Sequence, residues 1–267
     1  MTLDTRGPER GLPVFYWKPD EPTFGISVNF GDSLFPLIVE RIVKHPVACV
    51  HEDYTGPKLI PGGSVLHCAR DGDVLWGVGL RTEDDFISNP RFHDVRVAAV
   101  RGPITRSFLV SRYGFDVPQM YGDPAVLLPQ LFPEWTRRPV KGRVGIVPHF
   151  SNRHDYAASA GDQMLILPNR DPQQVVSDIL TCELVIAGSL HGLIVAEAYG
   201  IPARWINSSR DEPELKYYDY YEGTGRSPRP VRTVSQGLDS GGEPLPRSLN
   251  CERLLASFPR DVVIGRA

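Results

Sequence analysis

The segment with the clearest chemical potential joins a predicted strand to a predicted helix. The apolar run Leu184–Ala187 predicts a buried strand, and Ser189 is a typical N-cap for a helix that continues to Tyr199. His191 then lies in the first turn of that helix, where free backbone N–H groups and the helix dipole favour a bound anion. The neighbouring residues Leu190 and Gly192 lie in the same turn. The pattern predicts a phosphate or carboxylate site with an acid–base group, and the alternative is a plain strand–helix unit in which His191 caps its own helix.

Arg101 is the second candidate for anion binding. It closes the predicted strand Val95–Val100, and ligands of doubly wound sheets bind beyond the carboxyl ends of the strands. The planar guanidinium can hold a carboxylate or phosphate with two parallel hydrogen bonds. The alternative for Arg101 is a salt bridge at the surface.

Two aspartates are candidates for a general base or for orienting a sugar hydroxyl. Asp32 ends a loop that also contains Asn29, and we expect Asn29 to shape this loop around Asp32. Asp123 lies in a Gly-Asp-Pro turn. Each has a structural alternative, because Asp32 is a suitable N-cap for a helix at 33–44 and aspartate before proline is common in turns.

A cluster of tyrosines beside a lysine predicts a sugar-binding wall, because aromatic rings stack on the apolar faces of sugars. The candidates for binding an acceptor sugar are Lys216, Tyr217 and Tyr220, together with Asn29. The alternative for the tyrosines is ordinary packing between domains. His149 and His154 lie in a polar loop of the second domain, and an approach to the cleft is left open for them, although a lone exposed histidine usually has no role.

Four motifs in order resemble those of the polysaccharide pyruvyl transferase family. They are the Ser-Leu-His-Gly segment at 189–192, Asn-Phe-Gly-Asp at 29–32, Val-Arg-Gly-Pro at 100–103 and Gly-Asp-Pro at 122–124. The resemblance extends from about residue 25 to about residue 223. One position departs from it, because many members carry an arginine where this chain has Ser189. A different cation must then hold that part of the donor.

The resemblance implies transfer of pyruvate from phosphoenolpyruvate to a hexose, with formation of a cyclic ketal. Phosphoenolpyruvate is then a co-substrate, and no cofactor or metal is expected. The acceptor implied is a lipid-linked exopolysaccharide unit, and the location implied is the bacterial cytoplasm, with a peripheral place at the inner membrane face left open. The resemblance implies that Arg101 binds phosphoenolpyruvate. With the residue patterns above, we predict that His191, Asp32 and Asp123 are catalytic, with either aspartate as the base, and that Ser189, Leu190 and Gly192 bind the donor beside Arg101.

The motifs lie on a chain in which apolar strands alternate with amphipathic helices. This alternation predicts an α/β protein with parallel sheets. We expect two Rossmann-like domains that face a cleft, at 1–135 on the acceptor side and at 136–222 with the donor-site motif. The segment 223–267 is expected to pack back on the first domain. The resemblance implies the same arrangement, similar to the GT-B glycosyltransferase fold.

Composition excludes several other classes. The chain has 267 residues and a net charge of −3, which argues against a dedicated nucleic-acid-binding protein. Its four cysteines are scattered without a CxxC pair, as expected for reduced thiols in the cytoplasm, and no apolar run approaches the ~20 residues of a membrane span. Phosphate-loop, zinc and Gly-x-Ser-x-Gly motifs are missing from the sequence. A nucleotide-sugar glycosyltransferase and a non-catalytic protein that binds anionic glycans remain as alternatives, and the oligomeric state is left open.

Overall fold

The computed structural model describes residues 11–86, 92–156, 160–208 and 212–261. The outer ends of the two predicted terminal regions, residues 1–10 and 262–267, lie outside the described residues.

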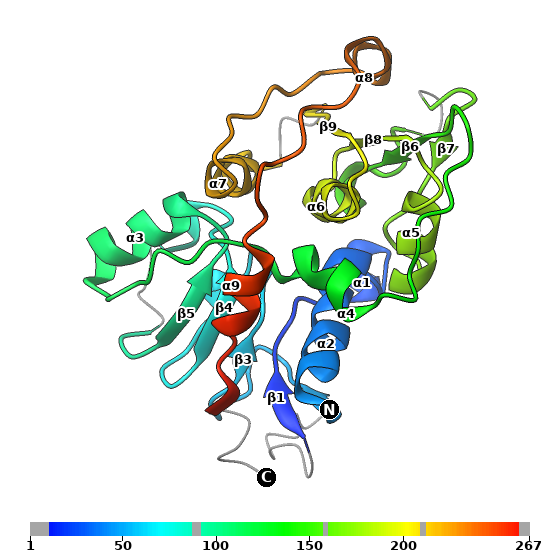
Figure 1. Ribbon diagram of the computed structural model, residues 1–267. Helices are drawn as coiled ribbons and strands as arrows, with labels where there is room; N and C mark the ends of the chain where they lie inside the picture. The colour runs from blue at the N-terminus through cyan, green and yellow to red at the C-terminus, as the bar shows by residue number, and fades with distance from the viewer. Residues whose placement is uncertain (1–10, 87–91, 157–159, 209–211, 262–267) are drawn as a thin grey trace.

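The described residues form two lobes, each built on a parallel sheet (Figure 1). The first sheet has the order β2-β1-β3-β4-β5 and the second has the order β7-β6-β8-β9. Their strands are β1 (Leu12–Val14), β2 (Val47–Cys49), β3 (Leu59–Ile60), β4 (Val74–Val78), β5 (Arg96–Val100), β6 (Val144–Val147), β7 (Met164–Leu165), β8 (Leu184–Ala187) and β9 (Ala203–Trp205). The prediction of an α/β chain with two parallel sheets is confirmed.

In each sheet the second strand is added on one side of the first strand, and the later strands are added on its other side, which reverses the strand order. The first sheet has the doubly wound order 2-1-3-4-5, not the 3-2-1-4-5-6 of the dinucleotide-binding Rossmann fold. The second sheet repeats the beginning of that order, with β6 as its first strand. The reversals fall between β1 and β3 and between β6 and β8, and these are the points where ligands of such sheets bind.

The helices connect and cover the strands. They are α1 (Glu21–Phe24), α2 (Phe30–Val43), α3 (Pro103–Tyr113), α4 (Leu128–Leu131), α5 (Pro172–Ile179), α6 (Leu190–Ala198), α7 (Leu215–Gly223), α8 (Val234–Ser240) and α9 (Cys251–Ala256). Four short 3₁₀ turns are η1 (Leu66–Cys68), η2 (Glu83–Phe86), η3 (Pro124–Leu127) and η4 (Phe150–Asn152). None of the helices within the described ranges combines the length and apolar character needed to cross a bilayer.

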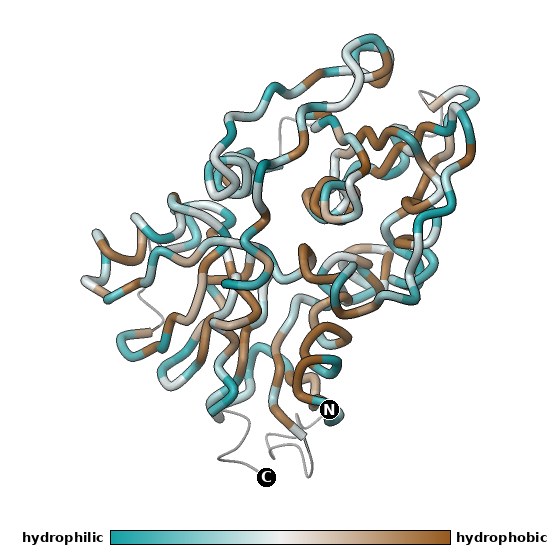
Figure 2. Tube along the Cα trace, viewed as in Figure 1, coloured by the Kyte–Doolittle hydropathy of each residue, from teal (hydrophilic) through white to brown (hydrophobic). Residues whose placement is uncertain are grey.

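Helix α6 begins and ends as its sequence predicts. Ser189 is its N-cap, and the Ser189 hydroxyl accepts a hydrogen bond from the N–H of Gly192 at 3.3 Å. Gly200 follows the helix with a φ of 69°, which favours glycine. Every residue from Leu190 to Glu197 is buried, and Figure 2 shows this helix as predominantly hydrophobic. Such a helix is a core element and not a surface helix.

Helix α2 begins three residues earlier than expected for an Asp32 cap. Its N-cap is Asn29, and Asp32 lies within the first turn. The side-chain amide of Asn29 donates to Asp32 at 2.5 Å, so the carboxylate is held by the preceding loop and does not cap the helix. The N-cap alternative for Asp32 is therefore wrong, because Asn29 already occupies the extended position before the helix.

One continuous cluster of buried side chains joins the two lobes. It includes Phe30 and Phe35 of α2, Ala125 after Asp123, and Leu193 and Ile194 of α6. The N–H of Phe30 also donates across the lobes to the carbonyl of Pro168, at 2.8 Å. Helices α2 and α6 are thus fixed relative to each other by a shared core.

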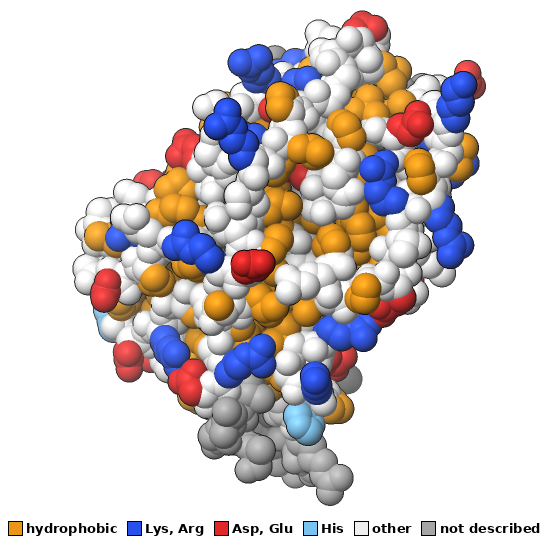
Figure 3. Space-filling view, viewed as in Figure 1, with side chains coloured by type: hydrophobic (Ala, Val, Ile, Leu, Met, Phe, Trp, Pro, Cys, Tyr) orange, Lys and Arg blue, Asp and Glu red, His pale blue; other side chains and the backbone are white. Residues whose placement is uncertain are grey.

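The C-terminal segment contacts both lobes. Helix α8 packs on β8, where Gly237 lies against Ile186, and α9 lies beside β4 (Figure 1). The indole N–H of Trp76 on β4 donates to the carbonyl of Leu254 at 3.1 Å. On the face drawn in Figure 3, Lys and Arg side chains are spread among Asp and Glu side chains.

Candidate active site

A cavity of about 310 Å³ lies where both sheets reverse direction. Its walls come from the segments that follow β1, β3 and β4 in one lobe and β6, β8 and β9 in the other. The lining residues are Trp17, Phe24, Asn29, Asp32, Ser64, Val65, His67, Arg81, His149, Phe150, Ser189, Leu190, His191, Glu212 and Lys216. The cavity therefore occupies the expected ligand position of two doubly wound sheets at once.

Two helix N-termini meet at this cavity. Asn29 and Asp32 lie at the start of α2, and Ser189, Leu190 and His191 lie at the start of α6. The first-turn amides of a helix lack partners within the helix and carry its positive dipole end. Sequence reasoning predicted this property for α6 alone, and the structure adds α2.

Gly31 is the residue that allows the two helix ends to approach so closely. A Cβ atom at this position would lie 2.1 Å from Nδ1 of His191, so any side chain would displace the imidazole. The ring of Phe35, one turn further along α2, meets the His191 ring edge to face at 5.4 Å. The ring of His191 is thus positioned by the other lobe.

His191 faces Asp123 through an incomplete ion pair. The distance from Nε2 to Oδ2 of Asp123 is 3.5 Å, and within the described ranges neither atom has a hydrogen bond. The other oxygen of Asp123 accepts from the N–H of Ala125 at 3.0 Å. Burial alone lowers the pKa of His191, but the charges of Asp123 and Asp32 outweigh it and raise the pKa above its usual value. The protonated imidazole is therefore favoured.

Asp32 is buried beside this pair. Burial raises the pKa of Asp32, and the raising is partly offset by His191 and by the hydrogen bond from Asn29. A carboxyl group whose pKa moves toward the working pH suits general base chemistry. The structure therefore brings together His191, Asp32 and Asp123, the three residues predicted to be catalytic.

A second cluster of ionisable side chains lines the cavity, from the loop after β6 and from the start of α7. Lys216 Nζ donates to Glu212, and it lies 3.3 Å from Nε2 of His149. Burial lowers the pKa of Lys216, against the opposing effect of Glu212. Burial, followed by the charges of Lys216 and His191, holds the pKa of His149 well below its usual value. Lys216 is thus a buried cation at the cavity, and His149, which sequence reasoning set aside as a lone histidine, is its neutral neighbour.

Arg101 does not line the cavity. Its guanidinium is buried and donates to Asp219 at 3.1 Å, to Ser64 at 2.7 Å and to the carbonyl of Leu80 at 2.7 Å. Gly79 provides the space for it, since a Cβ there would lie 2.1 Å from the guanidinium carbon. Direct contact with a donor would require these bonds to break. Arg101 forms neither the predicted surface salt bridge nor a free anion site, and it reaches the cavity only through Ser64.

Tyr217 and Tyr220 also lie away from the cavity wall. Tyr217 is stacked on Trp205 at 4.3 Å and its hydroxyl donates to the carbonyl of Gly188. The hydroxyl of Tyr220 donates to Glu197 at 2.7 Å. Both side chains are buried, which corresponds to the packing alternative and not to a sugar-binding wall.

Gly192 faces the sheet and not the cavity. A Cβ there would lie 2.9 Å from Val147 and 3.1 Å from Ala187, so this glycine lets α6 approach β6 and β8 closely. Its amide is already bonded to Ser189. Of the predicted donor-binding residues, the cavity wall contains Ser189 and Leu190.

Sequence reasoning missed the aromatic part of the wall. Trp17, Phe24 and Phe150 come from both lobes and contact one another, with ring centroids 5.0 to 6.1 Å apart. One signal was available, because Trp17 and Phe150 lie near the carboxyl ends of apolar runs that form β1 and β6, as Arg101 does for β5. Their convergence depends on the placement of two lobes and cannot be derived from local sequence.

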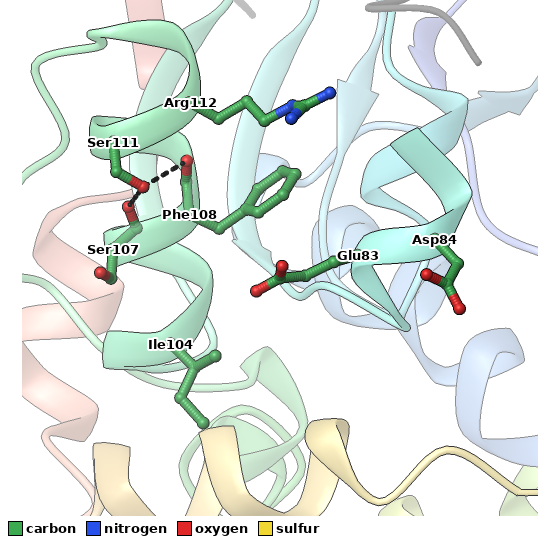
Figure 4. A pocket seen from close by; sticks show the side chains of 7 residues that line it. All are labelled: Glu83, Asp84, Ile104, Ser107, Phe108, Ser111 and Arg112. Atoms are coloured by element: carbon green, nitrogen blue, oxygen red, sulfur yellow. Dashed lines mark hydrogen bonds between the residues drawn. The ribbon is translucent and has the colours of Figure 1, made fainter. Parts of the chain in front are cut away.

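A larger hollow of about 660 Å³ lies between η2 and α3, on the first lobe (Figure 4). It contains none of the predicted site residues. The hydroxyl of Ser111 in this hollow donates back to the carbonyl of Ser107 at 2.7 Å, within its own helix. Across the parts of the chain that the structure describes, no group of three or more His, Cys, Asp and Glu side chains is placed to hold a metal ion.

Comparisons with known proteins agree with the resemblance in the motifs. Over 232 residues the chain is 26% identical to the uncharacterized protein L143 of Acanthamoeba polyphaga mimivirus, covering 82% of this chain and 76% of the relative. It is also 26% identical over 233 residues to the succinoglycan biosynthesis protein ExoV of Rhizobium meliloti (strain 1021), covering 83% of this chain and 67% of that protein. The sequence pattern of the polysaccharide pyruvyl transferase family matches residues 72–210, which is more than half of the chain and includes Arg101, Asp123 and His191. The chain therefore belongs to the polysaccharide pyruvyl transferase family.

Proposed function

We propose that this protein transfers the pyruvyl group of phosphoenolpyruvate to two hydroxyls of a hexose in a polysaccharide acceptor, forming a cyclic ketal. The observation that carries the proposal is the His191–Asp123 pair between two helix N-termini, in a cavity shared by both lobes. Family membership supplies the class of reaction, and the cavity supplies an acid, an anion site and a base for it.

The donor fits the cationic side of the cavity. Phosphoenolpyruvate carries a phosphate and a carboxylate, and first-turn amides at α2 and α6 are suited to bind such groups. The Ser189 hydroxyl lies at the same helix end, and Lys216 is the buried cation nearby. Lys216 then takes the place of the arginine that many family members carry at the position of Ser189. Arg101 acts as a positioning residue, because it holds Ser64 at the cavity wall.

The chemistry needs one acid and one base. Protonated His191 gives a proton to C3 of phosphoenolpyruvate, which makes C2 electrophilic. The first sugar hydroxyl adds to C2 and loses its proton to Asp32. The C2–phosphate bond then breaks, the second hydroxyl forms its bond to C2, and its proton leaves with the phosphate. Asp123 stabilises the charged imidazole, and preorganised charges of this kind lower the barrier where charge moves in the transition state.

The acceptor is proposed to be a lipid-linked unit of an exopolysaccharide, met in the cytoplasm at the inner face of the membrane. This part rests on the family resemblance and on pyruvyl transfer to a polysaccharide as the family's reaction.

The direct test is incubation with phosphoenolpyruvate and a panel of synthetic hexosides. We expect release of inorganic phosphate and an acceptor mass increase of one pyruvate less one water. Parallel reactions with nucleotide sugars test the glycosyltransferase alternative, and sugar transfer there would overturn the proposal. Hexoside binding without turnover of either donor would indicate a glycan-binding protein instead.

A further inference from the structure

The cavity has an aromatic side that the donor chemistry does not use. Trp17 follows β1, Phe24 ends α1 and Phe150 begins η4. Trp17 meets Phe24 edge to face at 5.3 Å and lies 5.0 Å from the tilted ring of Phe150. We call these three residues the aromatic wall.

The aromatic wall is built to hold its rings at the cavity. Helix α1 is capped at both ends: Asp20 accepts from the N–H of Thr23 at 3.0 Å, and Gly25 adopts a φ of 63°. Both caps fix the single turn that presents Phe24. In the other lobe, Arg153 donates to the carbonyl of Phe150 at 2.6 Å.

The wall also leaves apolar surface in contact with water. Phe24 is 39% exposed, and neither Phe24 nor Phe150 belongs to a core cluster of the described residues. An apolar surface inside a cavity with polar groups at its edge is typical of a ligand site. The polar groups that line the same cavity include Asn29 and Asp32 at α2, and Glu212 in the second lobe.

We propose that the aromatic wall is the acceptor subsite and binds the apolar face of a hexose. A hexose presents C–H groups on its faces and hydroxyls around its edge. Stacking on Trp17 and Phe150 would turn the hydroxyls toward the polar part of the cavity, where Asp32 and His191 lie. This inference rests on the proposed function and gives the acceptor role to the aromatic wall instead of Tyr217 and Tyr220.

The test separates acceptor binding from donor binding. Trp17→Ala and Phe150→Ala are each expected to raise the KM for the hexoside by about tenfold, which corresponds to about 1.4 kcal/mol of lost binding free energy. The KM for phosphoenolpyruvate should stay within about twofold of the wild-type value. Trp17→Phe should restore part of the hexoside affinity because it keeps a ring. Tyr218→Ala is the matched control, because Tyr218 is an exposed aromatic residue that does not line the cavity.

Binding of hexosides is also measured by saturation-transfer NMR without phosphoenolpyruvate. The probes are methyl glycosides of glucose, galactose and mannose and their disaccharides. If a hexoside binds the wild type and not Trp17→Ala, the subsite stands even if pyruvyl transfer fails. The inference is overturned if no probe binds the wild type, if the alanine variants bind equally well, or if their affinity for phosphoenolpyruvate falls in parallel.

Discussion

Two of the buried ion pairs among the described residues, Arg101–Asp219 and His191–Asp123, differ in how completely they are hydrogen-bonded. In the first pair, Asp219 also accepts from the N–H and the hydroxyl of Thr105, and Arg101 has two further acceptors. In the second pair, the facing atoms are 3.5 Å apart without a hydrogen bond in the described chain, and His191 lines a cavity.

This difference separates structural roles from functional ones. A buried network with every group satisfied holds the fold, because removing one partner leaves an uncompensated charge. A buried pair with unused hydrogen-bonding capacity at a cavity retains groups that can act on a ligand. Arg101, Asp123 and His191 all lie in motifs that resemble those of the family, and the surroundings of each side chain distinguish the two pairs.

The largest expected effect is on turnover when His191 is replaced. His191→Ala removes the proposed acid, and loss of such a group typically costs about 10²–10⁴-fold in rate. We expect that loss in phosphate release from phosphoenolpyruvate, measured at a temperature at which the variant is still folded. Retained turnover would contradict the catalytic assignment, and Leu238→Ala on the exposed part of α8 serves as the control.

The second largest effect is expected on the stability of the protein, when the Arg101–Asp219 pair is broken. Asp219→Ala leaves the Arg101 guanidinium buried without its partner, and breaking a buried pair in this way costs about 3–5 kcal/mol. We expect a large decrease in the free energy of unfolding measured with urea. The comparison variant is Asp123→Ala, which should cost less because a neutral His191 needs no counter-charge. Equal losses in the two variants would show that the pairs do not differ as described.

A smaller effect is expected where the two helix ends meet. Gly31→Ala places a methyl group against the His191 ring, which must move. A displacement of about 1 Å in a catalytic group can lower the rate by up to about 10²-fold. The new methyl group would also lie 2.6 Å from the Cβ of the buried His191 side chain, and overpacking of this kind typically costs about 1–3 kcal/mol, which exceeds the gain of about 1 kcal/mol in helix propensity. Reduced turnover with a moderate loss of stability is the expected pair of results, and unchanged turnover would show that the ring is not held by Gly31.

The smallest expected effect concerns how stability and turnover depend on pH through the His191–Asp123 pair. Because the pKa of His191 is raised in the folded protein, its contribution to stability is complete below the pKa of unfolded histidine and is lost as the pH rises through the folded value. Turnover should fall over the same alkaline range, as the acid loses its proton. Asp123→Asn removes the main group that raises this pKa, so the alkaline limb of kcat/KM should move to lower pH. An unmoved limb would assign the titration to another group.

Local sequence predicted the elements and missed the long-range partners. The β8–α6 unit was predicted within one residue because Ser189 and Gly200 mark its ends directly. The partner of Arg101 is 118 residues away, so its burial had no local signal. The same holds for Tyr217, which stacks on Trp205, and for the three rings of the aromatic wall. The start of α2 was misplaced because Asn29 and Asp32 are both suitable caps, and only the backbone shows which one is used.

The hydrogen bond from Phe30 to Pro168 and the core shared by α2 and α6 have a consequence for how substrates enter. Swinging the lobes apart would expose Phe30, Phe35 and Leu193 to water at once, so hinge opening is energetically unfavourable. The cavity is therefore preformed, and the proposed reaction needs no closure of one lobe over the other. We expect the substrates of that reaction to enter a cavity whose shape is already set by the shared core.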